Sequence, residues 1–279
     1  MVNMTRTIEA EAETLDYITF DEAFEITNYP AGERHVRLRN AVNLSTLTAI
    51  EATVRTFDDL AMVVTADRIV RRRGRTVEWF LPYFPFARHD RRIDSNDGFE
   101  LKLALEIVNE LNIVIADPHS EVTCQLRHFS QAEVVDHFAA AGLFDDDPIV
   151  IVPDAGAAKK AYSWLNGRPV VQALKKRDVR TGALSGFEVL ADDLGGRPCI
   201  IIDDICDGGG TFLGLAAVLR EVNAGPLTLA VTHGLFTKGT DHLLDSFDTV
   251  ACLTPTGDEP IAGVHTIPFS DLYSKGAIT

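Results

Sequence analysis

The segment "CIIIDDICDGGGTF", residues 199–212, combines residue types suited to binding a phosphorylated sugar. Its apolar start is followed by acids and glycines, which are Asp203, Asp204, Asp207, Gly208, Gly209 and Gly210. Glycines let backbone N–H groups turn toward an anion, and Thr211 opens a predicted helix whose N-terminus attracts phosphate. Carboxylates repel phosphate, so we expect the acids to accept hydrogen bonds from sugar hydroxyls or to bind the ligand through a divalent cation. The alternative is a glycine-rich turn with solvated aspartates.

The surrounding elements place this segment at a sheet edge. Strand-like and helix-like runs alternate through most of the chain, which predicts an α/β fold with mainly parallel sheets flanked by helices. Strands are predicted at 35–39, 77–83, 113–116, 149–152, 170–174, 198–202, 228–231 and 249–253, and helices at 58–73, 96–111, 155–165 and 211–222. Because strand 198–202 ends at the acids, the segment lies where open α/β sheets bind ligands.

The acidic segment 144–148, "FDDDP", is the predicted domain boundary. Its aspartates and proline resist regular structure, which divides the chain into domains 1–145 and 146–279. A chain of 279 residues fits two α/β domains of about 100–150 residues each. The alternative is a solvated loop inside one domain.

Composition excludes several classes of protein. The formal net charge of −15 argues against a nucleic-acid partner, and we interpret the arginines at 71–75 as a helix C-terminus. The four cysteines contain no C-x-x-C pair, which argues against a zinc site or a disulfide framework. No run approaches the ~18 apolar residues of a membrane helix. We therefore expect a cytoplasmic protein that binds small molecules and neither membranes nor nucleic acid.

Three other polar stretches follow predicted strands. Arg88, with His89 and Asp90, comes after strand 77–83, where a guanidinium can bind a triphosphate; the alternative is an exposed polar loop. His119 follows strand 113–116, and a lone histidine there is by itself more typical of a structural residue. The stretch 175–177, "KKR", ends strand 170–174 and opens a polar segment, 178–186, with the composition of a loop.

The segment 199–212 resembles the phosphoribosyl-binding motif shared by type I phosphoribosyltransferases and ribose-phosphate diphosphokinases, the PRPP synthetases. The stretch "LPYFPFARHDRR" at 81–92 resembles the ATP-binding signature of PRPP synthetases, which phosphoribosyltransferases lack. The stretches "YPAGE" at 29–33, "DPHS" at 117–120 and "VPDAGAAKKA" at 152–161 are also similar and follow the family order. The resemblance covers nearly the whole chain.

This resemblance implies two domains of the phosphoribosyltransferase-like fold in a homo-oligomer, a dimer or larger. It implies transfer of the β,γ-diphosphoryl group of ATP to the C1 hydroxyl of ribose 5-phosphate, with Mg²⁺, to give PRPP and AMP. The residues it implies for ATP binding are Tyr29, Glu33, Arg88, His89, Asp90 and His119. His119 and Asp154 match metal-associated residues, and Lys175 and Arg177 match a K-x-R on a catalytic loop. The residues it implies for binding the ribosyl phosphate are Asp203, Asp204, Asp207, Gly208, Gly209, Gly210 and Thr211.

One departure from the family motif concerns the acceptor. Gly208 stands where the family loop normally has Thr or Ser, which removes a hydrogen bond worth about 0.5–1.5 kcal/mol to a 5′-monophosphate. It also leaves room for a larger 5′ group, so the same chemistry on ADP-ribose is an alternative. A non-catalytic binding or regulatory subunit and a phosphoribosyltransferase are two further alternatives. The retained charged residues argue against the former, and the ATP-like signature argues against the latter.

Overall fold

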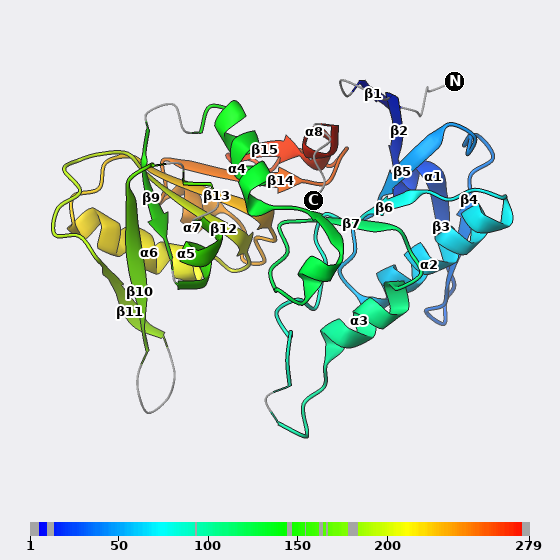
Figure 1. The fold of residues 1–279 in the computed structure, drawn as a ribbon, viewed down its shortest axis with the longest axis horizontal. Coiled ribbons are helices and arrows are strands. Elements are labelled where there is room, and N and C mark those ends of the chain that lie inside the picture. The colour runs from blue at the N-terminus through cyan, green and yellow to red at the C-terminus, as the bar shows by residue number, and fades with distance from the viewer. Residues whose placement is uncertain are drawn as a thin grey trace. The chain divides into compact units, whose positions relative to one another are not determined.

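The computed structural model describes residues 6–9, 14–92, 94–143, 147–153, 155–161, 164–165, 167–177 and 184–274. The chain folds into two compact units, whose ribbons are drawn in Figure 1. The first unit ends at Ser130 and also includes Pro255–Gly257 and the segment that starts at Phe269. The second contains Gln131–Thr254 and Asp258–Pro268. Each unit has a largely parallel sheet and helices, so the predicted α/β class is confirmed.

The division between the units differs from the predicted one after residue 145. The helix α4 (Gln131–Ala140) packs on other elements of the second unit, so that unit starts earlier than predicted. The end of the chain returns to the first unit, where the Tyr273 hydroxyl donates a hydrogen bond to Glu78. The Tyr273 ring also lies 5.0 Å from the Phe80 ring, centroid to centroid. These contacts join residues far apart in the sequence, which composition does not reveal.

The first unit is built on a six-stranded sheet in the order β1-β2-β5-β6-β7-β8. All neighbouring strands pair in parallel except β1 and β2. The strands are β1 (Arg6–Glu9), β2 (Thr14–Thr19), β5 (Leu47–Glu51), β6 (Glu78–Phe80), β7 (Ile113–Ala116) and β8 (Arg127–Phe129). The helices are α1 (Phe20–Ala23), α2 (Phe57–Arg72), α3 (Glu100–Val108), α8 (Phe269–Ser274) and the single 3-10 turn η1 (Thr123–Gln125).

Helix α2 shows why its sequence begins and ends a helix where it does. The Thr56 hydroxyl accepts from the Asp59 N–H, and the Asp59 carboxylate accepts from the Thr56 N–H, which is a capping box. Arg71 and Arg72 occupy the last turn, where the helix dipole favours cations. This confirms the interpretation of the basic cluster. Helix α3 is shorter than the predicted 96–111.

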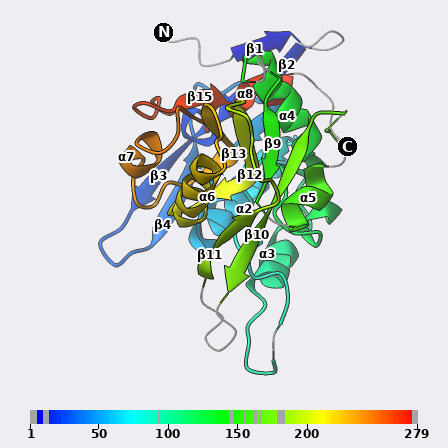
Figure 2. The same ribbon diagram turned by 90° about the vertical axis from the view of Figure 1, so that its left-hand side faces the viewer.

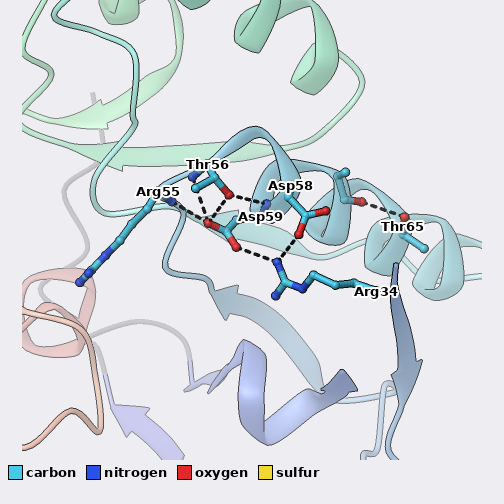
Figure 3. A network of polar contacts seen from close by, with 7 residues as sticks. Arg34, Arg55, Thr56, Asp58, Asp59 and Thr65 are labelled. Carbon is cyan, nitrogen blue, oxygen red and sulfur yellow. Dashed lines mark hydrogen bonds and ion pairs between the residues drawn. The ribbon is translucent and has the colours of Figure 1, made fainter. Parts of the chain in front are cut away.

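A hairpin of β3 (Phe24–Asn28) and β4 (Arg34–Leu38) is attached to the start of α2. Arg34 Nη1 lies 2.6 Å from Asp58 Oδ2 and 3.0 Å from Asp59 Oδ1, as Figure 3 shows. The same arginine therefore contacts both acids of the first turn of α2. This network fixes the end of the hairpin next to the turn that carries the stretch "YPAGE".

The second unit has a seven-stranded sheet in the order β11-β10-β9-β12-β13-β14-β15. Only β10 and β11 pair antiparallel. The strands are β9 (Ile149–Val152), β10 (Val170–Arg177), β11 (Leu184–Val189), β12 (Cys199–Cys206), β13 (Leu227–Gly234), β14 (Thr249–Thr254) and β15 (His265–Pro268). The helices are α4, α5 (Ala155–Ala161), α6 (Gly210–Glu221) and α7 (Asp241–Leu244).

Two strands of this unit differ from the prediction. Strand β12 continues to Cys206, so Asp203 and Asp204 lie in the strand and not after it. Residues 184–186, predicted as the end of a loop, form the start of β11. Helix α6 packs on β11, and both elements are labelled in Figures 1 and 2. The packing is close, since a Cβ added to Gly214 would lie 2.7 Å from Phe187 Cε2. Across the described ranges, none of the helices combines the length and apolar character needed to cross a bilayer.

Candidate functional site

The candidate site lies in the second unit, where the direction of the strand order reverses. From β9 the chain adds β10 on one side, and it then returns to add β12, β13 and β14 on the other side. The carboxyl ends of β9 and β12 are therefore neighbours at a topological switch point. Ligands of open α/β sheets bind in the crevice outside such a point. The acids and glycines of residues 203–211 follow directly along β12.

The two neighbouring acids of β12 leave opposite faces of the sheet, because side chains alternate along a strand. Cys199 and Ile201 belong to the core shared with α6, which assigns Asp203 to that face by the same alternation. Asp204 is buried, and its Oδ2 accepts a hydrogen bond of 2.6 Å from Lys160 Nζ of α5. The Asp204 N–H donates to Asp203 Oδ1 over 2.9 Å. Lys160 thus holds the Asp204 carboxylate, and the Asp204 backbone N–H holds the Asp203 carboxylate, at the end of β12.

The glycine loop has a conformation that its sequence permits. Gly209 has φ +76° and a Cβ there would lie 2.9 Å from His242 Nε2 and 3.0 Å from Leu243 Cδ2, so only glycine fits without strain. Gly209 is also the N-cap of α6 and provides no side chain to cap the first N–H groups. Helix α6 starts at Gly210, one residue before the predicted Thr211. An anion is the natural partner of such a helix start.

The segment after β13 is clamped to this loop. Thr237 Oγ1 donates to Asp207 Oδ1 over 2.6 Å, and the Thr237 N–H donates to the Asp207 carbonyl over 3.1 Å. His242 Nε2 donates to the Gly208 carbonyl over 3.3 Å. The carbon atoms of the Lys238 side chain lie next to Gly208. Asp207 therefore acts as an acceptor that fixes a neighbouring loop.

The cysteines of this unit are poor nucleophiles. Burial, with a smaller contribution from the nearby Asp203 and Asp207, raises the pKa of the Cys206 thiol to about 12. Burial also raises the pKa of Cys199 to about 11 and that of Cys252 to about 12. A thiol must lose its proton to react as a nucleophile or metal ligand. None of these three thiols is suited to catalysis at neutral pH.

The predicted catalytic residues Lys175 and Arg177 lie in β10, where Lys175 pairs with Phe187 and Arg177 with Leu184 of β11. The ladder is irregular between Lys176 and Arg177. Their side chains lie outside the described part of the structure, as does the whole of Asp154. No group of three His, Cys, Asp or Glu side chains within the described ranges is arranged to hold a metal ion.

The ATP-binding candidates occupy two places in the first unit. Arg88, His89 and Asp90 follow β6, and His119 follows β7. Ser120 Oγ donates to Asp90 Oδ2 over 3.2 Å, which joins these two loops. His89 Nδ1 lies 2.9 Å from Glu100 Oε2.

The other two candidates lie on a different element, the turn of the β3–β4 hairpin. The Tyr29 N–H donates to the Glu33 carbonyl over 2.8 Å, and the Tyr29 side chain is exposed. The hairpin is linked to α2 through Arg34, and Phe57 of α2 stacks on Phe86 at 4.1 Å between ring centroids. Packing therefore connects the hairpin to the loop that carries Arg88.

Sequence reasoning missed four residues around the glycine loop, which are Lys160, Thr237, Lys238 and His242. Lys160 lies inside the quoted stretch 152–161, but only its contact with Asp204 assigns it a position in the site. The other three follow β13, which neighbours β12 in the sheet. Polar residues just after a predicted parallel strand were the available signal.

Comparisons with known proteins agree with this architecture. No protein-family model matches the chain. A ribose-phosphate pyrophosphokinase of Corynebacterium efficiens is 25% identical over 304 residues, which cover 97% of this chain and 92% of the relative. That of Mycobacterium leprae is 27% identical over 90% of this chain and 81% of its own. Over nearly its whole length the chain is therefore similar to ribose-phosphate pyrophosphokinases.

The fold of this chain also matches a solved structure. The crystal structure of phosphoribosylpyrophosphate synthetase from Mycobacterium smegmatis aligns with a TM-score of 0.69 and 22% identity, over 90% of this chain and 88% of that one. The expectation of a phosphoribosyltransferase-like fold is thereby confirmed. The relatives are named as pyrophosphokinases, which are transferases, and this supports the expectation of an enzyme.

Proposed function

We propose that this chain transfers the β,γ-diphosphoryl group of ATP to the C1 hydroxyl of ribose 5-phosphate. The C1 oxygen forms a bond to the β-phosphorus, and the bond between that phosphorus and the oxygen bridging to the α-phosphate breaks. AMP leaves with the electron pair, the hydroxyl proton is released, and the second product is PRPP. The observation that carries the proposal is the acid-glycine loop 203–211 at the reversal of strand order.

The loop suits a phosphorylated sugar because it offers two kinds of group. The start of α6 after Gly209 supplies backbone N–H groups for the 5′-phosphoryl group. Asp203 and Asp204, at the end of β12, supply carboxylate oxygens for the sugar hydroxyls. Lys160 offsets the charge of Asp204, which lowers the repulsion between this edge and an anionic ligand.

Mg²⁺ fits the donor chemistry of the proposed site. Magnesium takes oxygen ligands and is usually held by one or two carboxylates together with substrate phosphates, not by a cage of protein ligands. The described residues contain carboxylates at the strand end, which are oxygen donors of this kind. Asp154 and His119 are the residues proposed to hold Mg²⁺, and when bound it neutralises charge on the ATP phosphates.

The cationic residues of β10 are proposed to act on the transferring group. Phosphoryl transfer needs positioning and charge neutralisation more than a general base. Lys175 and Arg177 supply two positive charges at the end of a strand in the same sheet as β12. The nucleotide is assigned to the first unit, to Tyr29, Glu33, Arg88, His89, Asp90 and His119.

Product analysis tests this function. Purified protein is mixed with Mg²⁺–ATP and ribose 5-phosphate, and the products are separated by anion-exchange chromatography and identified by ³¹P NMR. We expect AMP and PRPP in equal amounts, and no AMP when the acceptor is omitted. AMP absent with every phosphorylated ribose would contradict the function and leave the non-catalytic binding subunit as the explanation.

ADP-ribose is the second candidate acceptor, and the absence of a side chain at Gly208 favours it. A larger 5′ group requires space beside the loop. The nearest atoms to a Cβ at position 208 are Cγ, Cδ and Cε of the Lys238 stem, which side-chain rotation can move aside. A parallel reaction with ADP-ribose distinguishes the two acceptors. If ribose 5-phosphate is turned over far faster under the same conditions, ADP-ribose is excluded as the main acceptor.

A further inference from the structure

The side chain of Lys238 lies over the one loop glycine that departs from the expected family motif. A Cβ built on Gly208 would lie 3.2 Å from Lys238 Cδ, 3.3 Å from Cε and 3.5 Å from Cγ. Three consecutive atoms of the lysine stem therefore occupy the place where a Thr or Ser side chain at position 208 would begin. The Lys238 stem can lie in this place because residue 208 is a glycine and has no side chain.

The turn that carries Lys238 is fixed to the loop. Its predecessor Thr237 is bonded to Asp207 through both backbone and hydroxyl. The Gly239 N–H donates to the Phe236 carbonyl over 2.9 Å, and both of these residues have positive φ, 41° at Phe236 and 74° at Gly239. The turn thus adopts a specific backbone conformation that holds residue 238 beside residue 208.

The charges around the turn favour an anion there. The Lys238 side chain is exposed, and the described residues show no ion pair with an acid that would occupy its ammonium group. Of the acids nearby, Asp207 is bonded to Thr237 and Asp204 to Lys160. Thus Lys238 adds a positively charged side chain beside Gly208, two residues before the start of α6.

We propose that Lys238 binds the 5′-phosphoryl group of the sugar acceptor, and that the pair Gly208–Lys238 replaces the hydroxyl donor expected at position 208. This inference rests on the proposed function and assigns a specificity-determining residue to it. An ammonium group can bind either a 5′-monophosphate or a 5′-diphosphate ester. Ribose 5-phosphate and ADP-ribose are therefore separate arms of the test.

The test is calorimetric binding of each acceptor to wild type and to Lys238→Met, which keeps an unbranched stem and removes the charge. A hydrogen bond to a charged group is worth about 1.5–3 kcal/mol, so we expect acceptor affinity to fall roughly 10- to 100-fold. Lys238→Arg should retain most of the affinity. Lys102→Met, an exposed lysine on α3 of the first unit, is the matched control and should leave affinity unchanged.

A double-mutant cycle separates charge from packing. Gly208→Thr places a Cβ against the lysine stem and should weaken acceptor binding in wild type. In Lys238→Ala the same substitution should restore part of the lost affinity, because the threonine hydroxyl then has room to donate. Additive effects of the two substitutions would overturn the proposed replacement.

Kinetics distinguish this inference from the proposed function. We expect Lys238→Met to raise KM for the acceptor with little change in kcat or in KM for ATP. A variant that makes AMP and PRPP with normal acceptor affinity overturns the role of Lys238 and leaves the proposed function intact. Loss of acceptor affinity in a protein that releases no AMP supports the role of Lys238 and contradicts the function. Wild type that binds neither acceptor overturns both.

Discussion

Lys160 Nζ lies 2.6 Å from Asp204 Oδ2, and this ion pair joins α5 to the end of β12 across the reversal of strand order. The Asp204 side chain is 9% exposed and that of Lys160 31% exposed, so the pair is largely shielded from solvent. Helix α5 follows β9, the strand parallel to β12. The pair therefore couples the two strand ends between which the ligand crevice is expected.

Lys160→Met tests this coupling. The substitution keeps an apolar stem but leaves the charge of Asp204 next to Asp203 without the ammonium group. Because the pair is partly exposed, we expect a stability loss of about 1–3 kcal/mol and a weaker acceptor affinity. Urea unfolding and calorimetric binding measure the two effects. Lys159→Met, an exposed neighbour on α5, is the control; equal effects of the two substitutions would argue against a specific role for Lys160.

Gly209→Ala tests the conformation of the loop. The added Cβ meets His242 Nε2 at 2.9 Å and Leu243 Cδ2 at 3.0 Å, and the backbone has positive φ. Strain of this type costs about 1–3 kcal/mol, so we expect a lower unfolding midpoint and weak binding of ribose 5-phosphate. At Gly210 a Cβ meets nothing within 4 Å, so Gly210→Ala should keep the unfolding midpoint of wild type. A Gly209→Ala protein as stable as Gly210→Ala would show that the loop has another conformation.

Local patterns predict those parts of this fold that depend on neighbouring residues. The helical period and the basic end of α2 predict its first and last residues to within one residue. The apolar run Ile149–Val152 predicts β9 with its observed bounds. Helix α6 begins one residue from its predicted start, because glycines before an apolar periodic run are a local signal. Strand β11 was missed, since it is paired to β10 by tertiary context and its sequence is rich in turn-forming residues.

The site was predictable along one strand but not across strands. The segment 199–212 contains its own acids, glycines and helix start, so a single stretch indicates the ligand class. Lys160 and Lys238 lie near this segment because β9, β12 and β13 are adjacent in the sheet. The order of strands in the sheet cannot be predicted from the local sequence. The compact units divide the chain at Ser130 and not at residue 145 for the same reason, because long-range packing determines where α4 and the end of the chain lie.

Lys175→Ala tests the proposed catalytic role. Removal of one well-placed cationic stabiliser should reduce turnover on the order of 10²–10³-fold, with an unchanged unfolding midpoint. Single-turnover release of AMP measures the effect on the transfer step. The adjacent Lys176→Ala is the matched variant and should retain turnover. Near-normal turnover of Lys175→Ala would remove this lysine from the mechanism, and a loss confined to Lys176→Ala would assign the role to its neighbour.

Thiol reactivity follows from burial. Cys124 is exposed, whereas Cys199, Cys206 and Cys252 are buried and have a raised pKa that keeps them protonated at neutral pH. At about pH 7.5, we expect an aromatic disulfide reagent to modify Cys124 rapidly and the other three cysteines only after unfolding, because only a thiolate reacts with it. Mass spectrometry of tryptic peptides identifies the modified site. Rapid modification of Cys206 in the native protein would contradict the packing under the loop.

The Arg34–Asp59 contact should make stability depend on pH. Burial raises the pKa of the Asp59 carboxyl, but hydrogen bonds from Arg34, from Thr56 and from backbone N–H groups outweigh it, so the pKa is lowered. A lowered folded pKa contributes stability above the unfolded value of about 3.9, and this stability is lost as pH falls through the folded pKa. Asp59→Ala should therefore cost about 1–2 kcal/mol at pH 7 and less at pH 3, measured by urea unfolding. Asp58 is more exposed and does not cap α2, so Asp58→Ala is the control with a smaller cost. An Asp59→Ala deficit of the same size at both pH values would show that its carboxylate charge does not stabilise the contact between the hairpin and α2.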